Sequence, residues 1–224
     1  MIPWKALDRA RVPGSDGEVS LHVRDREFSI RTAGTELMNS RIHGSEEALA
    51  ELACSRLNPE LPWQILIGGL GMGYTLAAAL EESGSDTRIH VSELIPAVVR
   101  WNRDHLGHLA GRPLDDSRVR VEEEDVVKTI GKRKAVWDAI LLDVDNGPAG
   151  LTRESNDRLY GTLGLKSSFN ALKPGGVLAV WSSAVDGAFT QRLKRVGFKT
   201  EIVSVRARKS GKGSRHTIWL GVKP

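Results

Sequence analysis

The fold of this chain is decided by the stretch QILIGGLGMG, residues 64–73. A short apolar run enters a turn that holds four glycines, and a helix-forming run over residues 74–82 follows. Glycine has no Cβ, so the backbone of such a turn can approach a ligand where a side chain would collide with it. The stretch therefore predicts a strand, a turn and a helix that together bind a nucleoside.

An acidic residue follows at the spacing that a nucleoside site requires. Glu93 lies twenty residues after Gly73, at the end of a second apolar run. An acid about 20 residues beyond a glycine turn accepts hydrogen bonds from the ribose hydroxyls in nucleotide-binding folds. Glycine turns alone also connect strands to helices without any ligand, so the paired acid supplies most of the specificity.

The composition is that of an ordinary soluble protein. The chain has 224 residues, 40% of them hydrophobic and 27% charged, with a formal net charge of +4. These values disfavour disorder and fibrous structure. No apolar stretch approaches the roughly 18 to 20 residues that cross a bilayer, and the N-terminus lacks the apolar segment of a signal peptide. Cys54 is the only cysteine, which excludes an internal disulfide. We expect a cytoplasmic protein without a membrane partner.

Residues 1–60 are expected to form an N-terminal extension. Residues 1–18 look irregular, and the alternation of apolar and polar residues over 19–30 predicts an antiparallel β-hairpin. Ser45 and the two glutamates after it predict a helix N-cap with an acidic first turn. That helix is expected to end at residues 58–59.

Residues 61–224 are expected to form the main domain, because strands and helices alternate from residue 63 onward. Strands are expected at 65–68, 89–93, 119–122, 139–143 and 177–182, and later helices at Pro96, over 155–172, and before Gly197. Two β-rich runs at 201–205 and 216–222 predict a closing antiparallel hairpin. The predicted fold is α/β, with a doubly wound, mostly parallel seven-stranded sheet.

Candidate site residues lie where these strands end, because ligands of open α/β sheets bind beyond the carboxyl ends of the strands. The N–H groups of the turn and of the next helix favour a carboxylate on the ligand. Asp125 is placed to accept from the exocyclic amine of adenine while Val126 donates its N–H, and Asp143 is expected closest to the reacting end. The expected ligand-binding residues are Gly68, Gly69, Leu70, Gly71, Gly73, Glu93, Leu94, Asp125, Val126 and Asp143.

Each acid also has a structural alternative. Glu93 and Asp143 would equally serve as polar residues where a strand meets water. Asp125 follows three glutamates and fits a solvated acidic turn. Asp145 and Asn146 fit an Asx-type turn.

Other chemistries have weaker support. His105 and His108 lie one helical turn apart but no third ligand is evident, so we expect no metal site. The turn lacks the Gly-Lys-Ser/Thr of a triphosphate-binding loop, and the closing hairpin argues against a dehydrogenase. Five cations and no acid lie between Arg206 and Arg215. This cluster leaves nucleic acid open as a partner, although without aromatic residues it equally fits a solvated hairpin loop.

The order of these features resembles the class I S-adenosylmethionine-dependent methyltransferase fold. Within that fold, residues 67–73, 92–99 and 137–149 and the leading hairpin are similar to the spermidine synthase branch. That branch transfers an aminopropyl group from decarboxylated S-adenosylmethionine to a polyamine. The resemblance implies that the chain binds S-adenosylmethionine or its decarboxylated form.

The chain departs from that branch at acidic positions. Spermidine synthases carry an aspartate in the turn where this chain has Gly71, and a Tyr-His-Glu element that residues 45–49 do not match. Their D-S-x-D loop becomes DVDN at residues 143–146. Binding a polyamine requires several converging carboxylates.

We therefore expect methyl transfer from S-adenosylmethionine to an unidentified small molecule, with Asp143 as the base or orienting residue. Aminopropyl transfer and a non-catalytic adenosyl-binding protein remain the alternatives. The exposed N-terminal hairpin is a candidate contact of a homodimer.

Overall fold

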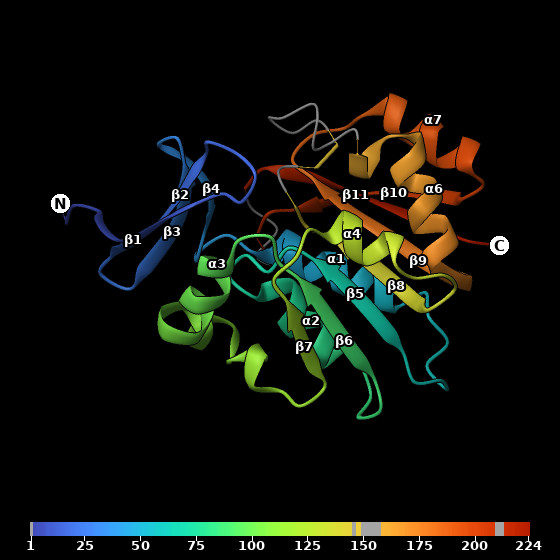
Figure 1. Cartoon of the computed structure of the whole chain (residues 1–224), viewed down its shortest axis with the longest axis horizontal. Coiled ribbons are helices and arrows are strands. Elements are labelled where there is room, and N and C mark those ends of the chain that lie inside the picture. The colour runs from blue at the N-terminus through green and yellow to red at the C-terminus, as the bar shows by residue number, and fades with distance from the viewer. Residues whose placement is uncertain (1, 145–146, 149–157, 209–212) are drawn as a thin grey trace.

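The computed structural model describes residues 2–144, 147–148, 158–208 and 213–224, which form two β-sheets and the helices around them (Figure 1). The first sheet is a four-stranded antiparallel meander, and the second has seven strands. None of the helices in these ranges combines the length and the apolar character needed to cross a bilayer.

The N-terminal sheet is larger than the predicted hairpin. Its strands are β1 (Lys5–Arg11), β2 (Glu18–Arg24), β3 (Glu27–Thr32) and β4 (Thr35–Asn39), paired in that order. The hairpin is confirmed as β2 and β3, but the expectation of an irregular segment over residues 1–18 was wrong. β1 is exposed along most of its length. β1 forms because its backbone pairs with β2, and it does not need a buried apolar face. Its sequence therefore shows no alternation of apolar and polar residues that would predict a strand.

The seven-stranded sheet confirms the predicted fold class. Its strands are β5 (Gln64–Gly68), β6 (Arg88–Ser92), β7 (Val119–Glu122), β8 (Trp137–Leu142), β9 (Leu172–Ser182), β10 (Lys199–Arg206) and β11 (Arg215–Val222). Their order is β10-β11-β9-β8-β5-β6-β7, and only the pairs that involve β11 are antiparallel. β9 begins five residues before the predicted start at 177, because Gly175 and Gly176 exchange backbone hydrogen bonds with Lys223.

Helices cover both faces of this sheet. They are α1 (Gly44–Cys54), α2 (Tyr74–Glu81), α3 (Pro96–Trp101), α4 (Val126–Gly131), α6 (Thr162–Ala171) and α7 (Gly187–Val196). α3 continues as a π-helical segment, η1 (Asn102–Leu106), and as the short 3₁₀ helices η2 (Gly107–Ala110) and η3 (Pro113–Asp115). The predicted helix over 155–172 corresponds to α6, and its first three residues lie outside the described ranges.

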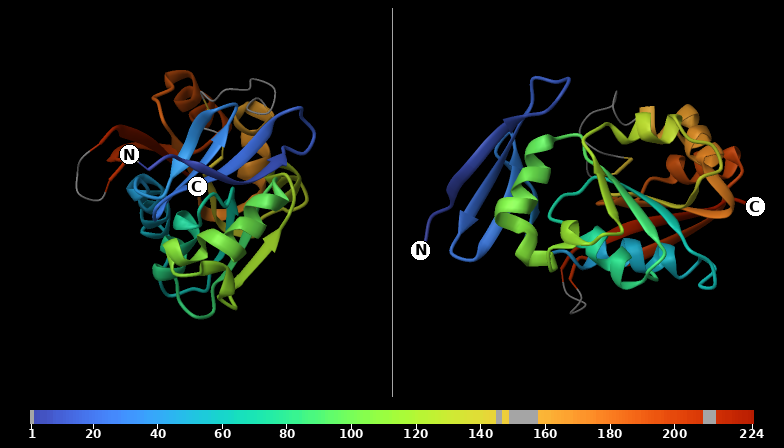
Figure 2. Two further views of the ribbon diagram at one scale, coloured as in Figure 1. Left: turned by 90° about the vertical axis from the view of Figure 1, so that its left-hand side faces the viewer. Right: turned by 60° about the horizontal axis from the view of Figure 1, so that its bottom comes forward.

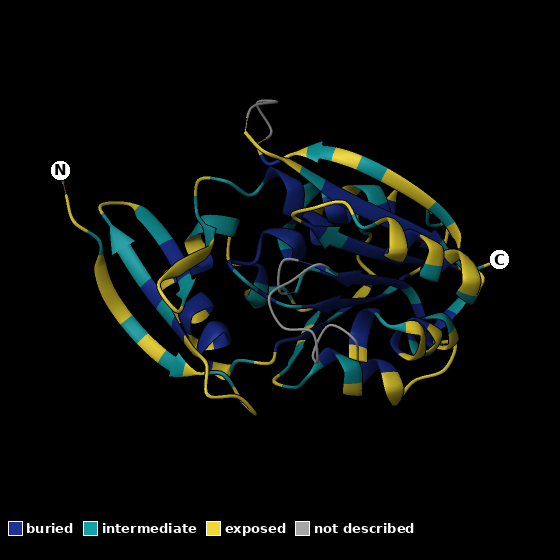
Figure 3. Cartoon of the chain, turned by 90° about the horizontal axis from the view of Figure 1, so that it is seen from above, coloured by how far each residue is buried: buried dark blue, intermediate teal, exposed yellow. Residues whose placement is uncertain are grey.

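The core consists of two apolar layers, one on each face of the sheet. Ile65 and Ile67 pack into the layer with α1, α2 and α3, whereas Leu66 packs into the layer with α4, α6 and α7. The central strands are buried on both sides (Figure 3). Such strands read as continuous apolar runs, which is why the sequence revealed them.

The N-terminal sheet lies beside α3 (Figure 2), and Met38 of β4 packs against Gly71 of the glycine turn. Asp8 of β1 accepts hydrogen bonds from the indole N–H of Trp101 at 2.7 Å and from Arg100 at 2.9 Å. The hydroxyl of Tyr74, the first residue of α2, donates to the carbonyl of Ser40 at 3.2 Å. These contacts fix the small sheet at the carboxyl ends of β5 and β6.

Candidate active site

Parallel pairing brings the predicted site residues to one edge of the sheet. β5 lies between β6 and β8, which is where the winding of the chain reverses. The N–H of Gly69 donates to the carbonyl of Ser92 at 2.9 Å, and the N–H of Asp143 donates to the carbonyl of Gly68 at 3.0 Å. The turn and the ends of β6 and β8 are therefore immediate neighbours, at the position where open α/β sheets bind ligands.

The glycines of the turn are required by its own packing. Gly69, Gly71 and Gly73 have φ values of 87°, 53° and 86°. A Cβ on Gly69 would lie 2.5 Å from the carbonyl oxygen of Asp143, and one on Gly71 would lie 2.9 Å from the sulfur of Met38. The backbone here approaches the end of β8 and the N-terminal sheet as closely as a residue without a side chain allows.

Glu93 holds the turn in place. Its carboxylate is buried and accepts hydrogen bonds from the N–H groups of Leu70 and Ile95, each at 2.8 Å. Leu94 beside it is 40% exposed. The predicted contact with a ribose stays a prediction, and the carboxylate has in addition a structural role that the sequence did not reveal.

Asp125 also has a structural role. It is the N-cap of α4, where its carboxylate accepts from the N–H of Val127 at 2.9 Å, and it lies 3.7 Å from Arg158. Val126 is buried, and its side chain packs against Gly68, where a Cβ would lie 2.9 Å away. The predicted contacts of Asp125 and Val126 with adenine stay predictions.

Glu46 is a site residue that the sequence did not single out. α1 begins at Gly44 with His43 as its N-cap residue, so the prediction of Ser45 as the N-cap was wrong. The Ser45 hydroxyl lies 2.6 Å from the carboxyl of Glu46 instead. The Thr75 hydroxyl lies 2.8 Å from the carboxylate of Asp143 and 3.2 Å from the carbonyl of Glu46. We call Glu46 and Asp143 the carboxyl pair.

Burial and mutual repulsion keep a proton on the carboxyl pair. Burial, and after it the negative charge of Asp143, raise the pKa of Glu46 to about 7. Burial also raises the pKa of Asp143, to about 6, while the hydrogen bond from Thr75 acts in the opposite direction. The two groups titrate together near neutral pH, which is where a general base works best.

A second acidic contact adjoins the carboxyl pair. His43 stacks on the ring of Tyr74 at 4.0 Å, and its Nδ1 lies 3.2 Å from the carboxylate of Glu47. Burial raises the pKa of Tyr74 to about 12, with further contributions from Glu47 and Glu46. Carboxylates from α1 and from the end of β8 thus converge on one side of the turn.

Asn102 is another candidate site residue without a sequence signal. Its side-chain amide donates to the carbonyls of Gly71 at 2.8 Å and Val98 at 2.9 Å. Within the described residues, its buried oxygen has no hydrogen-bond partner, and it lies 3.3 Å from where a Cβ on Gly73 would be. Asn102 begins η1, and π-helical segments often occur at functional sites.

Other candidate features lie away from this edge or remain undescribed. Among the described residues no three potential metal ligands come together, and the ring of His108 packs edge-on against Phe28 at 5.8 Å. Lys209 and Lys212 of the basic cluster lie outside the described ranges, so nucleic-acid binding stays a prediction.

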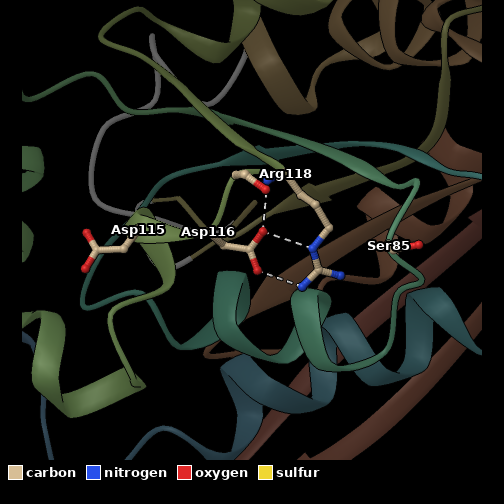
Figure 4. A pocket seen from close by; sticks show the side chains of 5 residues that line it. Ser85, Asp115, Asp116 and Arg118 are labelled. Carbon is tan, nitrogen blue, oxygen red and sulfur yellow. Dashed lines mark hydrogen bonds and ion pairs between the residues drawn. The ribbon is translucent and has the colours of Figure 1, made fainter.

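A surface hollow of about 560 Å³ lies at the opposite edge of the sheet. It is lined by Ser85, Asp115, Asp116, Ser117 and Arg118 (Figure 4). Arg118 bonds both carboxylate oxygens of Asp116 and donates to the carbonyls that end α2. These residues precede β6 and β7, so the hollow lies at the amino ends of the strands and its ion pair is structural.

Solved structures identify the fold of this chain. No family model matches the sequence, and no curated protein matches it either. A spermidine synthase from Thermotoga maritima superposes with a TM-score of 0.75 at 18% identity, over 98% of this chain and 73% of that one. A spermidine synthase in complex with the transition state analogue AdoDATO gives a TM-score of 0.77 at 19% identity, over 98% and 74%. The chain therefore has the spermidine synthase fold, a class I methyltransferase-like fold, as the sequence predicted.

Proposed function

We propose that this protein is a transferase that binds S-adenosylmethionine and moves its methyl group to an amine. The observation that carries the proposal is the carboxyl pair, which lies beside the glycine turn at the edge where the sheet reverses. The turn, Glu93 and the N-terminus of α2 suit the donor, and the carboxylates beyond them suit a cationic acceptor.

Two features of this edge support that donor. Glu93 would accept hydrogen bonds from the ribose hydroxyls, and the N-terminus of α2 would favour the carboxylate of the methionine part. The likeness to a spermidine synthase solved with AdoDATO supports a ligand derived from S-adenosylmethionine. A donor without that carboxylate presents only an ammonium to the turn. Spermidine synthases carry an aspartate in this turn. This chain has Gly71 at that position instead, and the uncharged thioether of Met38 packs against it.

The acceptor is proposed to be an amine because acidic groups gather next to the turn. An ammonium loses its hydration on entering, and paired carboxylates offset that cost. It must also lose a proton before its nitrogen can attack, and Asp143 with Glu46 is placed to take it. When bound, the donor supplies a sulfonium carbon, at which the new N–C bond forms as the C–S bond breaks. The residues of the chain hold the nitrogen in line and accept its proton.

Aminopropyl transfer from the decarboxylated donor is the second candidate. The likeness to two spermidine synthases favours it. The carboxyl pair would serve this reaction in the same way, because a nitrogen again attacks a carbon bonded to a sulfonium.

Product mass separates the candidates. The protein is incubated with putrescine and a panel of other amines, together with either donor, and the products are analysed by mass spectrometry. We expect a methylated amine with S-adenosylmethionine. An aminopropylated amine formed only with the decarboxylated donor would replace this proposal with the second candidate. Donor binding without product across the panel would indicate a non-catalytic binding protein.

Two variants check that the product arises at this edge. Asp143→Asn is expected to lose at least about 100-fold in turnover, since it cannot act as a base. Asp115→Asn, at the opposite edge, is the matched control and is expected to keep full activity.

A further inference from the structure

A line of hydrogen bonds leads from the carboxyl pair to the surface. The Ser45 hydroxyl lies 2.6 Å from Oε2 of Glu46 and 2.8 Å from Nδ1 of His216. The other ring nitrogen of His216, Nε2, lies 3.0 Å from the hydroxyl of Ser214. Three contacts therefore connect a buried carboxyl to an exposed serine.

The line is built from parts that are distant in the sequence. Ser45 is fully buried on α1, and His216 is half-buried on β11, 171 residues later. The N–H of Gly44 donates to the carbonyl of Ala207 at 2.9 Å, which ties the start of α1 to the β10–β11 hairpin. The ring of His216 packs edge-on against Trp181 at 4.8 Å, so its orientation is fixed.

Each hydroxyl has only one hydrogen, so the line has two complementary arrangements. When Glu46 is protonated, it donates to Ser45, Ser45 donates to Nδ1, and Nε2–H donates to Ser214. When Glu46 is ionised, every bond reverses: Ser45 donates to Glu46, Nδ1–H donates to Ser45, and Ser214 donates to Nε2.

We propose that Glu46, Ser45, His216 and Ser214 form a proton wire that carries the proton released during transfer from the carboxyl pair to water. That this proton comes from the acceptor amine rests on the proposed function. The two arrangements of hydrogens depend on the folded chain alone.

The step conserves protons and charge. The carboxyl proton of Glu46 moves to the oxygen of Ser45, whose own hydrogen moves to Nδ1. The hydrogen on Nε2 moves to Ser214, whose hydroxyl hydrogen passes to water. Glu46 becomes a carboxylate, one proton enters the solvent, and His216 changes tautomer while its ring stays neutral.

The surrounding charges suit this direction of transfer. Among the described residues, the titratable groups around Glu46 are Asp143 after β8, Glu47 of α1 with its partner His43, and Tyr74 of α2, and His216 of β11 is linked to it through Ser45. Burial lowers the pKa of His216, so the ring remains neutral where Glu46 titrates. A neutral imidazole relays a proton by exchanging tautomers.

The tautomer of His216 is the direct readout. In ¹⁵N-histidine-labelled protein without substrate, nitrogen chemical shifts recorded between about pH 5 and pH 9 distinguish Nδ1–H, Nε2–H and imidazolium forms. We expect a change from Nε2–H at low pH to Nδ1–H at high pH, near the midpoint at which Glu46 ionises. Glu46→Gln and Ser45→Ala are expected to abolish the change. A single tautomer at all pH values, or a simple change to imidazolium, would overturn the wire.

His90 is the matched control. It is half-buried on β6, packs edge-on against Trp137 at 5.0 Å, and burial lowers its pKa as it does for His216. Because His90 has no contact with the wire, its shifts are expected to be the same in wild type, Glu46→Gln and Ser45→Ala.

Turnover tests the role in catalysis. Ser45→Ala and His216→Phe are expected to lower kcat by roughly tenfold or more with KM for the donor unchanged, and added imidazole is expected to restore part of the rate. His90→Phe is expected to match wild type. Full activity of both wire variants would refute the role. A wild type that shows the tautomer change but forms no product would refute the proposed function and leave the wire standing.

Discussion

At the scale of single residues, Glu46 shows how folding raises the pKa of an ordinary carboxyl towards neutral pH. In the folded chain its pKa is raised from 4.5 to about 7. The folded state therefore retains a proton that the unfolded chain releases, and the stability of the fold falls as the pH rises through that interval.

Replacing Glu46 with Gln is expected to stabilise the fold at pH 8 by about 3 kcal/mol and to leave stability at pH 4 nearly unchanged. Urea denaturation at the two pH values measures the difference. The exposed Glu81, changed to Gln, is the control and is expected to show no such pH dependence. An equal effect of Glu46→Gln at both pH values would contradict the assigned pKa.

Glu93 and Asp143 are expected to differ in what their loss affects. Glu93→Ala removes two charge-assisted bonds to backbone N–H groups, so it is expected to weaken donor binding at least about tenfold and to destabilise the fold by about 3 kcal/mol. Asp143→Ala is expected to lower turnover more than donor affinity. Calorimetry and steady-state kinetics on both variants give the ranking, and the opposite ranking would overturn these roles.

At the scale of elements, the glycine turn depends on one close approach. Gly69→Ala would place a Cβ 2.5 Å from the Asp143 carbonyl oxygen, at a φ of +87°. We expect a loss of at least about 2 kcal/mol in the free energy of unfolding. Gly84→Ala has no atom within 4 Å of the new Cβ and is expected to change stability by no more than about 1 kcal/mol. Equal losses of stability for Gly69→Ala and Gly84→Ala in thermal denaturation would contradict the close packing of Gly69 against Asp143.

The N-terminal sheet is held to α3 through Asp8. Hydrogen bonds from Trp101 and Arg100 lower the pKa of Asp8 to about 2. The stability that these hydrogen bonds give is fully present above pH 3.8, the usual pKa of an aspartate, and it is lost as the pH falls through about 2. Asp8→Ala is expected to speed hydrogen exchange in β1, whereas Asp16→Ala in the β1–β2 loop is not. Unchanged exchange in β1 would mean that other contacts hold the sheet.

Elements were predictable where burial imposes a pattern. β5 and β8 are buried on both faces, so their apolar runs marked them in the sequence. β1 is exposed and relies on pairing with β2, so no local pattern indicated it. The start of α1 was misplaced because the hydroxyl of Ser45 contacts Glu46 and His216 rather than a backbone N–H.

At the scale of the whole molecule, the site joins residues from both ends of the chain. The strand ends that carry Glu93 and Asp143 were predictable, because parallel strands end at one edge. Glu46 and His216 were not, because α1 and the β10–β11 hairpin come together only in the folded protein. The sequence therefore indicated the proposed donor side of the candidate site but not the acidic side next to it.

We propose that the glycine turn and Glu93 bind an adenosyl sulfonium compound. Calorimetric titration of wild type and Glu93→Ala with S-adenosylmethionine measures this binding. We expect saturable binding by wild type and an affinity at least about tenfold lower in the variant. No heat at millimolar donor in its carboxylated or decarboxylated form, or equal affinity in the two proteins, would contradict it.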